Sequence, residues 1–195
     1  FYASSSSVYG NSKSFPLKED QTLYPTNTYS LTKKFNEDLS NIFIKYYKIN
    51  AVGLRFFTVY GEWGRPDMFY SKAIEAAFSG KKLYINNYGN HFRDFTYIQD
   101  VNKILFKLMK SKNNLKNNVI NICSNNPINI IKIVNKIEKY SKKIKIIKRN
   151  LQLADVLKTH GSNYKIFKNN LIIKFTNFDQ GIYNTIQWYK QYFKI

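Results

Sequence analysis

The sequence lacks the marks of a secreted, membrane-spanning or disulfide-stabilised protein. Its one cysteine, Cys123, cannot form an internal disulfide, so a reducing compartment suits it, and we interpret it as a core residue. No apolar run approaches the roughly 20 residues that a membrane-spanning helix needs. No charged segment followed by an apolar stretch and a small-residue cleavage site opens the chain. We therefore expect a globular, cytoplasmic protein that does not act in a membrane.

Acidic residues are also scarce. Twelve Asp and Glu face 31 Lys and Arg, which gives a formal net charge of +19. Such a charge raises the question of nucleic-acid binding, because lysine and arginine neutralise phosphates. The lysines are scattered among Asn, Ile, Tyr and Phe, as an A+T-rich coding bias would produce, and they form no extended basic patch. We expect no nucleic-acid partner, and a salt-dependent affinity for DNA or RNA would overturn that expectation.

The hydrophobic pattern predicts alternating strands and helices. Apolar residues recur at Phe35, Leu39, Ile42 and Tyr46, a spacing that predicts a helix over about 29–48 with a buried stripe. The run over residues 51–60 is apolar and stops at glycine, as in a buried parallel strand. Further helices are predicted at 69–79, 98–110, about 130–137 and 178–193, and strands at 83–85, 95–97, 119–123 and 143–147. The fold class is α/β.

Tyr29 and Lys33 stand four residues apart at the start of the first predicted helix, so their side chains share one face. A phenol is a weak base at neutral pH, and a neighbouring ammonium stabilises the phenolate. Alone, this pair is a weak signal in a chain that has 16 tyrosines. The serine run before Val8 gives it weight, because serines at the carboxyl end of a strand face the crevice in which open α/β sheets bind ligands. Ser5 could relay a proton to Tyr29 there, whereas Ser4 suits a polar turn.

Four motifs in this order resemble the extended short-chain dehydrogenase/reductase family, and in particular its UDP-glucuronate 4-epimerases. The resemblance covers nearly the whole chain and thins after about residue 125. The motifs are residues 2–10 (YASSSSVYG), 29–34 (YSLTKK), 54–68 (LRFFTVYGEWGRPDM), and Gly89 with 93–98 (RDFTYI).

The resemblance implies NAD as the cofactor and a set of catalytic roles. Ser5 takes the catalytic Ser/Thr position, Tyr29 is the base, and Lys33 holds the nicotinamide ribose. Tyr29 and Lys33 thereby also bind the cofactor, and Phe56 is expected to pass beside the nicotinamide.

The resemblance also implies a UDP-sugar site. Thr58 matches a position that contacts the sugar and phosphate region, Arg65 one that faces the sugar carboxylate, and Arg93 one that binds the diphosphate. Ser6 and Ser7 occupy the two substrate-facing positions that hold Asp and Glu in related 4,6-dehydratases. Because a serine hydroxyl is no competent acid at neutral pH, epimerisation is expected instead of elimination.

Two departures from the family pattern qualify the resemblance. Gln152 and Asp155 match a segment that helps hold the nucleotide, but the proline and glycine usual in that segment are missing. The chain also has no glycine-rich pyrophosphate motif, so we expect a segment before Phe1, and we expect these residues alone to bind NAD poorly. We interpret His91 and His160 as loop residues. Trp63 belongs either to the substrate loop or to the packing.

The predicted organisation is the distal half of a Rossmann-type parallel-sheet domain plus a smaller C-terminal substrate-binding lobe. Residues 1–62 and about 94–125 form the first, and residues 63–93 and 126–195 the second. The predicted activity is NAD-dependent epimerisation at C4 of UDP-glucuronate. Two alternatives are a 4-epimerase of neutral UDP-hexoses and a non-catalytic remnant that binds a nucleotide sugar. A homodimer is expected, because the family commonly pairs through the helix that carries the tyrosine.

Overall fold

The computed structural model describes residues 1–111, 118–152, 155–171 and 173–195. Leu153 and Ala154, which fall within the altered nucleotide segment, lie outside these ranges. The elements, with two short 3-10 turns named η1 and η2, are β1 (Tyr2–Ser5), η1 (Ser6–Tyr9), α1 (Thr28–Tyr47), β2 (Val52–Phe56), β3 (Thr58–Tyr60), α2 (Phe69–Ser79), β4 (Leu83–Ile85), η2 (Asn86–Gly89), β5 (Phe92–Tyr97), α3 (Ile98–Lys110), β6 (Asn118–Ile122), β7 (Pro127–Asn129), α4 (Ile130–Tyr140), β8 (Ile146–Lys148), α5 (Tyr164–Lys168) and α6 (Phe178–Phe193).

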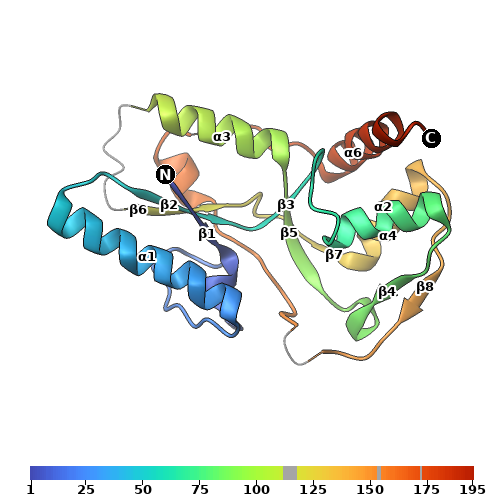
Figure 1. Cartoon of the computed structure of the whole chain (residues 1–195), viewed down its shortest axis with the longest axis horizontal. Helices are drawn as coiled ribbons and strands as arrows, with labels where there is room; N and C mark the ends of the chain where they lie inside the picture. Colours follow the sequence, from blue (N-terminus) through green and yellow to red (C-terminus); the bar gives the residue numbers. More distant parts are fainter. Residues whose placement is uncertain (112–117, 153–154, 172) are drawn as a thin grey trace.

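The first lobe is built on a parallel sheet with the strand order β1-β2-β6. Helices α1 and α3 lie on opposite sides of this sheet (Figure 1). On the α3 side, apolar residues of β2 and β6 pack against Val101, Ile104 and Leu108, so this layer has an ordinary hydrophobic core. The α/β fold class is confirmed.

The predicted strand over 51–60 is wrong as a single element, because the chain changes sheets at Phe57. The Phe57 amide still donates to the Ile122 carbonyl at 3.1 Å, while its ring packs with Val8 and Cys123. From Thr58 onward the chain pairs with β5 instead of with β1 and β6. Burial of the Phe57 ring ends β2 and redirects the next residues into the second lobe.

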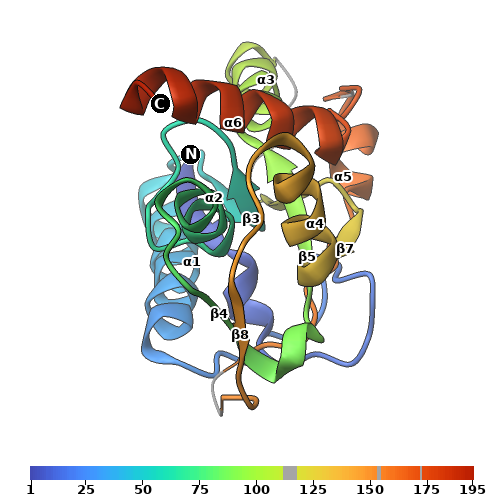
Figure 2. The ribbon, with the colours of Figure 1, turned by 90° about the vertical axis from the view of Figure 1, so that its right-hand side faces the viewer.

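In the structure we use second lobe for the part built on the sheet β3-β5-β7 and the two-stranded sheet β4-β8. It therefore includes β3 and β5, most of whose residues fall within the predicted bounds of the first lobe. Figure 2 looks onto the second lobe, with α6 crossing above α2 and α4. The observed β8 begins at Ile146, three residues after its predicted start at 143. The observed β5 begins at Phe92, three residues before its own predicted start at 95. The other predicted helices and strands are found within a few residues of their predicted bounds.

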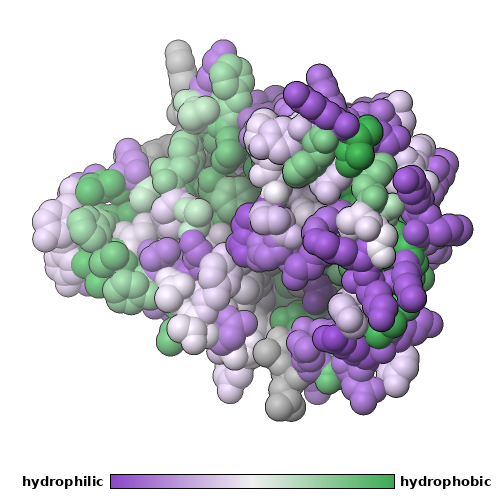
Figure 3. Space-filling model, turned by 45° about the vertical axis from the view of Figure 1, so that its right-hand side comes forward, coloured by the Kyte–Doolittle hydropathy of each residue, from purple (hydrophilic) through white to green (hydrophobic). Residues whose placement is uncertain are grey.

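Helix α1 begins at a capping box in which the Asn27 side chain accepts from the Ser30 amide and the Ser30 hydroxyl accepts from the Asn27 amide. The predicted buried stripe on this helix is wrong. Phe35 is 60% exposed, Ile42 50% and Tyr46 66%. The space-filling view shows hydrophobic surface gathered at the α1 end of the molecule (Figure 3). The stripe faces away from the sheet, and the residues that α1 buries are Ser30 and Glu37.

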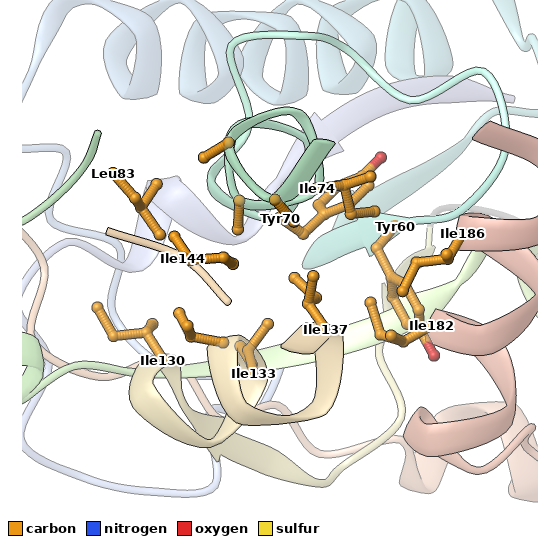
Figure 4. Packing of buried hydrophobic residues seen from close by; sticks show 14 of the residues in the cluster. Tyr60, Tyr70, Ile74, Leu83, Ile130, Ile133, Ile137, Ile144, Ile182 and Ile186 are labelled. Atoms are coloured by element: carbon orange, nitrogen blue, oxygen red, sulfur yellow. The ribbon is translucent and has the colours of Figure 1, made fainter. Parts of the chain in front are cut away.

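The core of the second lobe lies between α2, α4 and α6. Figure 4 shows isoleucines of α4 and α6 facing Tyr60 and the α2 residues Tyr70 and Ile74. Gly181 on α6 passes so close to the Tyr60 ring that an added Cβ would lie 2.1 Å from its hydroxyl oxygen, so a side chain at 181 would push the helix away. No helix among the described residues is both long enough and apolar enough to cross a membrane.

Candidate active site

Ser5 ends β1 and caps the 3-10 turn that follows it. Its backbone is extended, and its hydroxyl oxygen accepts a hydrogen bond from the Ser7 amide at 3.2 Å. Ser5 pairs in register with Phe56, the last residue of β2, so the two lie side by side at the carboxyl edge of the sheet. The Phe56 side chain is half-buried and packs against the α3-side core.

Tyr29 and Lys33 share one face of α1, as their spacing predicts. The Lys33 ammonium lies 5.7 Å from the centre of the Tyr29 ring and donates to the Ala3 carbonyl at 3.1 Å. The Tyr29 ring is 52% exposed. Lys33 therefore connects the first turns of α1 to β1, the strand that ends at Ser5.

Five of the predicted substrate residues surround one cavity of about 280 Å³ next to Ser5. They come from four separate parts of the chain and are Ser6, Ser7, Thr58, Arg93 and Asp155. The Ser7 hydroxyl is buried and has no hydrogen-bond partner in the described structure. A buried polar group without a partner is costly, so this hydroxyl is ready to bind a ligand.

Arg93 hydrogen-bonds to backbone carbonyls and forms no ion pair with its neighbour Asp94 in the described structure. Its Nη1 donates to the carbonyls of Phe92 and Leu157, at 3.0 and 3.3 Å. Burial lowers the pKa of Arg93, and the nearby Asp155 carboxylate opposes that change. Because a guanidinium remains protonated in proteins, the cavity keeps a partly desolvated positive charge.

A second cavity, of about 240 Å³, shares Thr58, Arg93 and Asp155 with the first and is also lined by His91. His91 lies outside the helices and strands, as expected for a loop residue, but its side chain is buried. Its Nε2 lies 3.9 Å from Asp155 Oδ2 and has no hydrogen-bond partner. Burial, followed by the Arg93 charge, lowers the pKa of His91.

Asp94, next to Arg93 in the chain, is the centre of a buried cluster of hydrogen bonds. The fully buried carboxylate accepts from the amide and hydroxyl of Ser124 at 3.1 and 2.8 Å, and from the Gly161 amide at 3.0 Å. The Thr159 hydroxyl accepts from the Asp94 amide at 3.2 Å. These bonds hold the segment after Asp155 against β5. The only sequence signal is that Asp94 belongs to the quoted RDFTYI motif.

Arg65 and Gln152 are not among the residues that line these two cavities. The exposed Arg65 guanidinium forms an ion pair with Asp67, with a distance of 2.9 Å between Arg65 Nε and Asp67 Oδ1. The hydrogen bond with Asp67 is the main cause that raises the pKa of Arg65, and Tyr29 adds a smaller effect in the same direction. Gln152 lines an adjoining cavity of about 620 Å³, which shares Asp155, Val156 and Lys158 with the cavity beside Ser5.

Trp63 precedes Arg65 by two residues in the loop after β3. Its ring lies 5.3 Å from that of Trp188 and 4.9 Å from that of Tyr192, both on α6. Its φ of 58° lies in the left-handed region, which is rare for a large side chain. Trp63 therefore packs against α6 while staying 73% exposed.

A family model described as the NAD dependent epimerase/dehydratase family matches residues 1–123. The chain belongs to this family. A UDP-glucuronate 4-epimerase of Arabidopsis thaliana is 33% identical, over 98% of this chain and 48% of the relative. The crystal structure of UDP-glucuronic acid 4-epimerase from Bacillus cereus, in complex with UDP-glucuronic acid and NAD, superposes with a TM-score of 0.92 and 31% identity.

That superposition covers 97% of this chain and 60% of the Bacillus cereus chain. A protein named MoeE5, solved with UDP-glucose and NAD, has a TM-score of 0.90 and 29% identity over 98% of this chain and 64% of its own. The chain thus spans about half the length of the Arabidopsis relative and about three fifths of these solved structures.

The described residues fit the nicotinamide end of NAD. Tyr29 and Lys33 present a hydroxyl and an ammonium on one accessible face beside the end of β1. Such groups suit the hydroxyls of a ribose. Phe56 lies at the same sheet edge, next to Ser5. No residues of this sequence form the glycine-rich turn that binds a dinucleotide pyrophosphate.

Proposed function

We propose that the protein containing this chain uses NAD to epimerise UDP-glucuronate at C4, which gives UDP-galacturonate. The observation that carries the proposal is the single cavity formed by Ser6, Ser7, Thr58, Arg93 and Asp155 beside Ser5. Arg93 would bind the diphosphate, because its planar fork and permanent charge match phosphate oxygens. Such a protein works in the cytoplasm, where nucleotide sugars and NAD are available.

In this mechanism Tyr29 takes the proton of the C4 hydroxyl, directly or through Ser5. NAD, when bound, would accept the hydride from C4 and later return it. Loss of proton and hydride leaves a ketone at C4, and the sugar turns so that the hydride returns to its other face. Tyr29 gives the proton back, so the reaction has no net redox change. Lys33 favours the phenolate form of Tyr29, which exists before the proton is taken and again after it is returned.

Epimerisation fits this site better than elimination of water. Elimination needs an acid and a base close to the sugar, and the turn after Ser5 offers only the hydroxyls of Ser6 and Ser7. The 4-keto form of a uronic acid is a β-keto acid that loses carbon dioxide unless its carboxylate is held. Arg65 would hold it after exchanging its ion pair with Asp67 for one with the substrate.

A neutral UDP-hexose is the second candidate substrate. The observation in its favour is that Asp67 already occupies the Arg65 guanidinium, so Arg65 is not free to bind a carboxylate. Both substrates would use Ser5, Tyr29 and Lys33 in the same way. They differ in whether Arg65 contributes to turnover.

An assay with two substrates tests the proposal. The protein, expressed with its coding sequence upstream of Phe1, is incubated with NAD and either UDP-glucuronate or UDP-glucose, and the product sugar is identified by NMR. We expect UDP-galacturonate from UDP-glucuronate. Turnover of UDP-glucose alone would replace the substrate assignment. Binding of UDP without turnover of either sugar would favour a non-catalytic remnant.

We also propose that the protein is a homodimer that pairs through α1. The support is the exposed apolar stripe of Phe35, Leu39, Ile42 and Tyr46, which is unusual on a helix that packs on a sheet.

A further inference from the structure

Three polar side chains form a row beneath α1, on the sheet face opposite the apolar α3 layer. Ser4, Arg55 and Asn121 are partners in register across β1, β2 and β6. They are 2%, 3% and 0% exposed, so the centre of this face holds a desolvated cation where an aliphatic side chain would be usual. This row is what α1 packs against.

Glu37 reaches from α1 into this row. Its carboxylate accepts from Arg55 Nε at 2.9 Å and from Arg55 Nη2 at 2.8 Å, a bidentate pair in which both side chains are buried. The Ser4 hydroxyl donates to the same carboxylate at 2.5 Å. The geometry leaves the helix little freedom to slide or turn, because a fork of two parallel hydrogen bonds tolerates little displacement.

Tyr9 holds Arg55 from the other side. Arg55 Nη1 donates to the Tyr9 hydroxyl at 2.8 Å, and that hydroxyl donates to Asn121 Oδ1 at 2.7 Å. Burial raises the pKa of Tyr9 to about 12, so the phenol stays protonated and can donate. Burial alone would lower the pKa of Arg55, but its hydrogen bonds with Glu37 and Tyr9 outweigh burial and raise it. The Arg55 guanidinium is thus held by η1 through Tyr9, and indirectly by β6 through the bond from Tyr9 to Asn121, in addition to its pair with Glu37.

Stability alone does not account for this arrangement. A buried ion pair is usually no more stabilising than apolar side chains of similar volume, whereas its geometry is more exacting. The sheet face under α3 has an apolar layer, so the fold could have used one under α1 as well. Instead, Ser30 and Glu37 are the two residues that α1 buries.

Glu37 lies on the same face of α1 as the predicted catalytic side chains. Tyr29, Lys33 and Glu37 follow one another at intervals of four residues, which places them along one helical stripe. Lys33 adds a hydrogen bond to Ala3, the residue before Ser4. The ion pair therefore lies beneath the middle of the helix that carries Tyr29 and Lys33.

We propose that Glu37 and Arg55 are positioning residues, whose ion pair fixes Tyr29 and Lys33 relative to Ser5. The inference rests on the proposed function. A displacement of about 1 Å between reacting groups can cost roughly a hundredfold in rate while binding is unaffected. Loss of the pair should therefore lower kcat and leave UDP binding unchanged.

The decisive variant replaces both partners, E37M with R55M, so that no unpaired buried charge remains. E37D is the second variant: it keeps the charge but shortens the side chain, and it serves if the double variant does not fold. D38N is the matched control, because Asp38 follows Glu37 on the same helix and forms an exposed ion pair with Lys34. Each full-length protein is measured for melting temperature, UDP affinity by calorimetry, kcat and KM, and its crystal structure is determined.

We expect the double variant to keep its melting temperature and UDP affinity, to lose about tenfold to a hundredfold in kcat, and to show Tyr29 displaced from Ser5. The loss of kcat should be smaller in E37D than in the double variant, and D38N should keep the wild-type kcat. A folded double variant with wild-type kcat, or with Tyr29 in its original place, would overturn the proposal. If the wild-type protein turns over neither sugar, the proposed function fails, and the position of Tyr29 in the variant structures still decides the positioning role.

Discussion

Asp94 and Gly161 are 67 positions apart in the sequence, yet a hydrogen bond of 3.0 Å joins the Gly161 amide to the Asp94 carboxylate. The bond is buried, and Asp94 directly follows Arg93, which lines the cavity beside Ser5. Asp94 therefore fixes the position of the segment that brings Asp155 to the cavity, although no role for Asp94 itself followed from the motif that contains it.

The first prediction concerns the pH dependence of stability. Burial raises the pKa of Asp94, so the folded state binds a proton that the unfolded state has released. The stability that this group contributes is complete below its unfolded pKa of about 4 and declines as pH rises through the raised folded value. D94N should be less stable than wild type, and the difference should narrow as pH increases.

Urea denaturation over a series of pH values measures this effect. D179N is the control with the opposite sign, because hydrogen bonds, first from Lys136 and then from Tyr140, hold the pKa of Asp179 below its usual range. The difference in the free energy of unfolding between D179N and wild type should widen as pH increases. Parallel curves for wild type and D94N would contradict the assignment to Asp94.

The second prediction is that R93M weakens UDP binding about tenfold to a hundredfold, the cost of losing one or two hydrogen bonds to a charged group. The UDP affinity of R93K should lie between those of wild type and R93M, because a lysine keeps the positive charge but loses the paired donors of the guanidinium. Isothermal titration calorimetry with UDP measures both. K81M removes a surface cation that is paired with Glu75 and should leave the affinity unchanged. An equal loss in K81M would mean that net charge, and not the cavity, binds the ligand.

The third prediction is that Y29F lowers kcat by roughly two to four orders of magnitude, as loss of a general base does. UDP affinity should change less than twofold, because Tyr29 is not among the residues that line the Arg93 cavity. Y46F is the matched control, since it removes the hydroxyl of an exposed tyrosine on the same helix. Substantial turnover by Y29F would move the role of base to another group.

The fourth prediction concerns the exposed stripe of α1. Replacing Phe35 and Ile42 by lysine should convert a dimer into a monomer, because it places charges in an apolar contact. Light scattering coupled to size-exclusion chromatography reads the mass. F106K changes an exposed phenylalanine on α3 and should leave the dimer intact. A monomeric wild-type protein, or a dimer that survives both lysines, would exclude pairing through α1.

The sequence pattern predicts the alternation of strands and helices well, because local periodicity reflects which side of an element is apolar. It fails for α1, where the regular spacing of Phe35, Leu39 and Ile42 predicts the helix correctly and its orientation wrongly. An apolar stripe predicts that something covers that face, and the pattern does not say whether the sheet or another surface would do so. The sheet-facing side carries Glu37, whose partner Arg55 comes from a strand that the pattern treats as simply apolar.

Some residues of the candidate site could likewise be predicted from the sequence, and others could not. Tyr29 and Lys33 could be paired from spacing, because residues four apart in a helix are always neighbours. Motif order placed Thr58, Arg93 and Asp155, and the structure brings them to one cavity. Spacing could not indicate the burial of His91 or the hydrogen bonds of Asp94, because both depend on contacts with residues more than 25 positions away. The roles of all these residues remain predictions.

The contact between Trp63 and Trp188 supplies a built-in optical reporter. The chain contains two tryptophans, and they face each other across the junction of the Arg65 loop and α6. Tryptophan emission from this chain therefore originates at one place, beside the arginine proposed to meet the sugar carboxylate. If Arg65 leaves Asp67 to bind a uronic acid, the loop and its indole move together, and the fluorescence should change on addition of UDP-glucuronate and stay constant on addition of UDP.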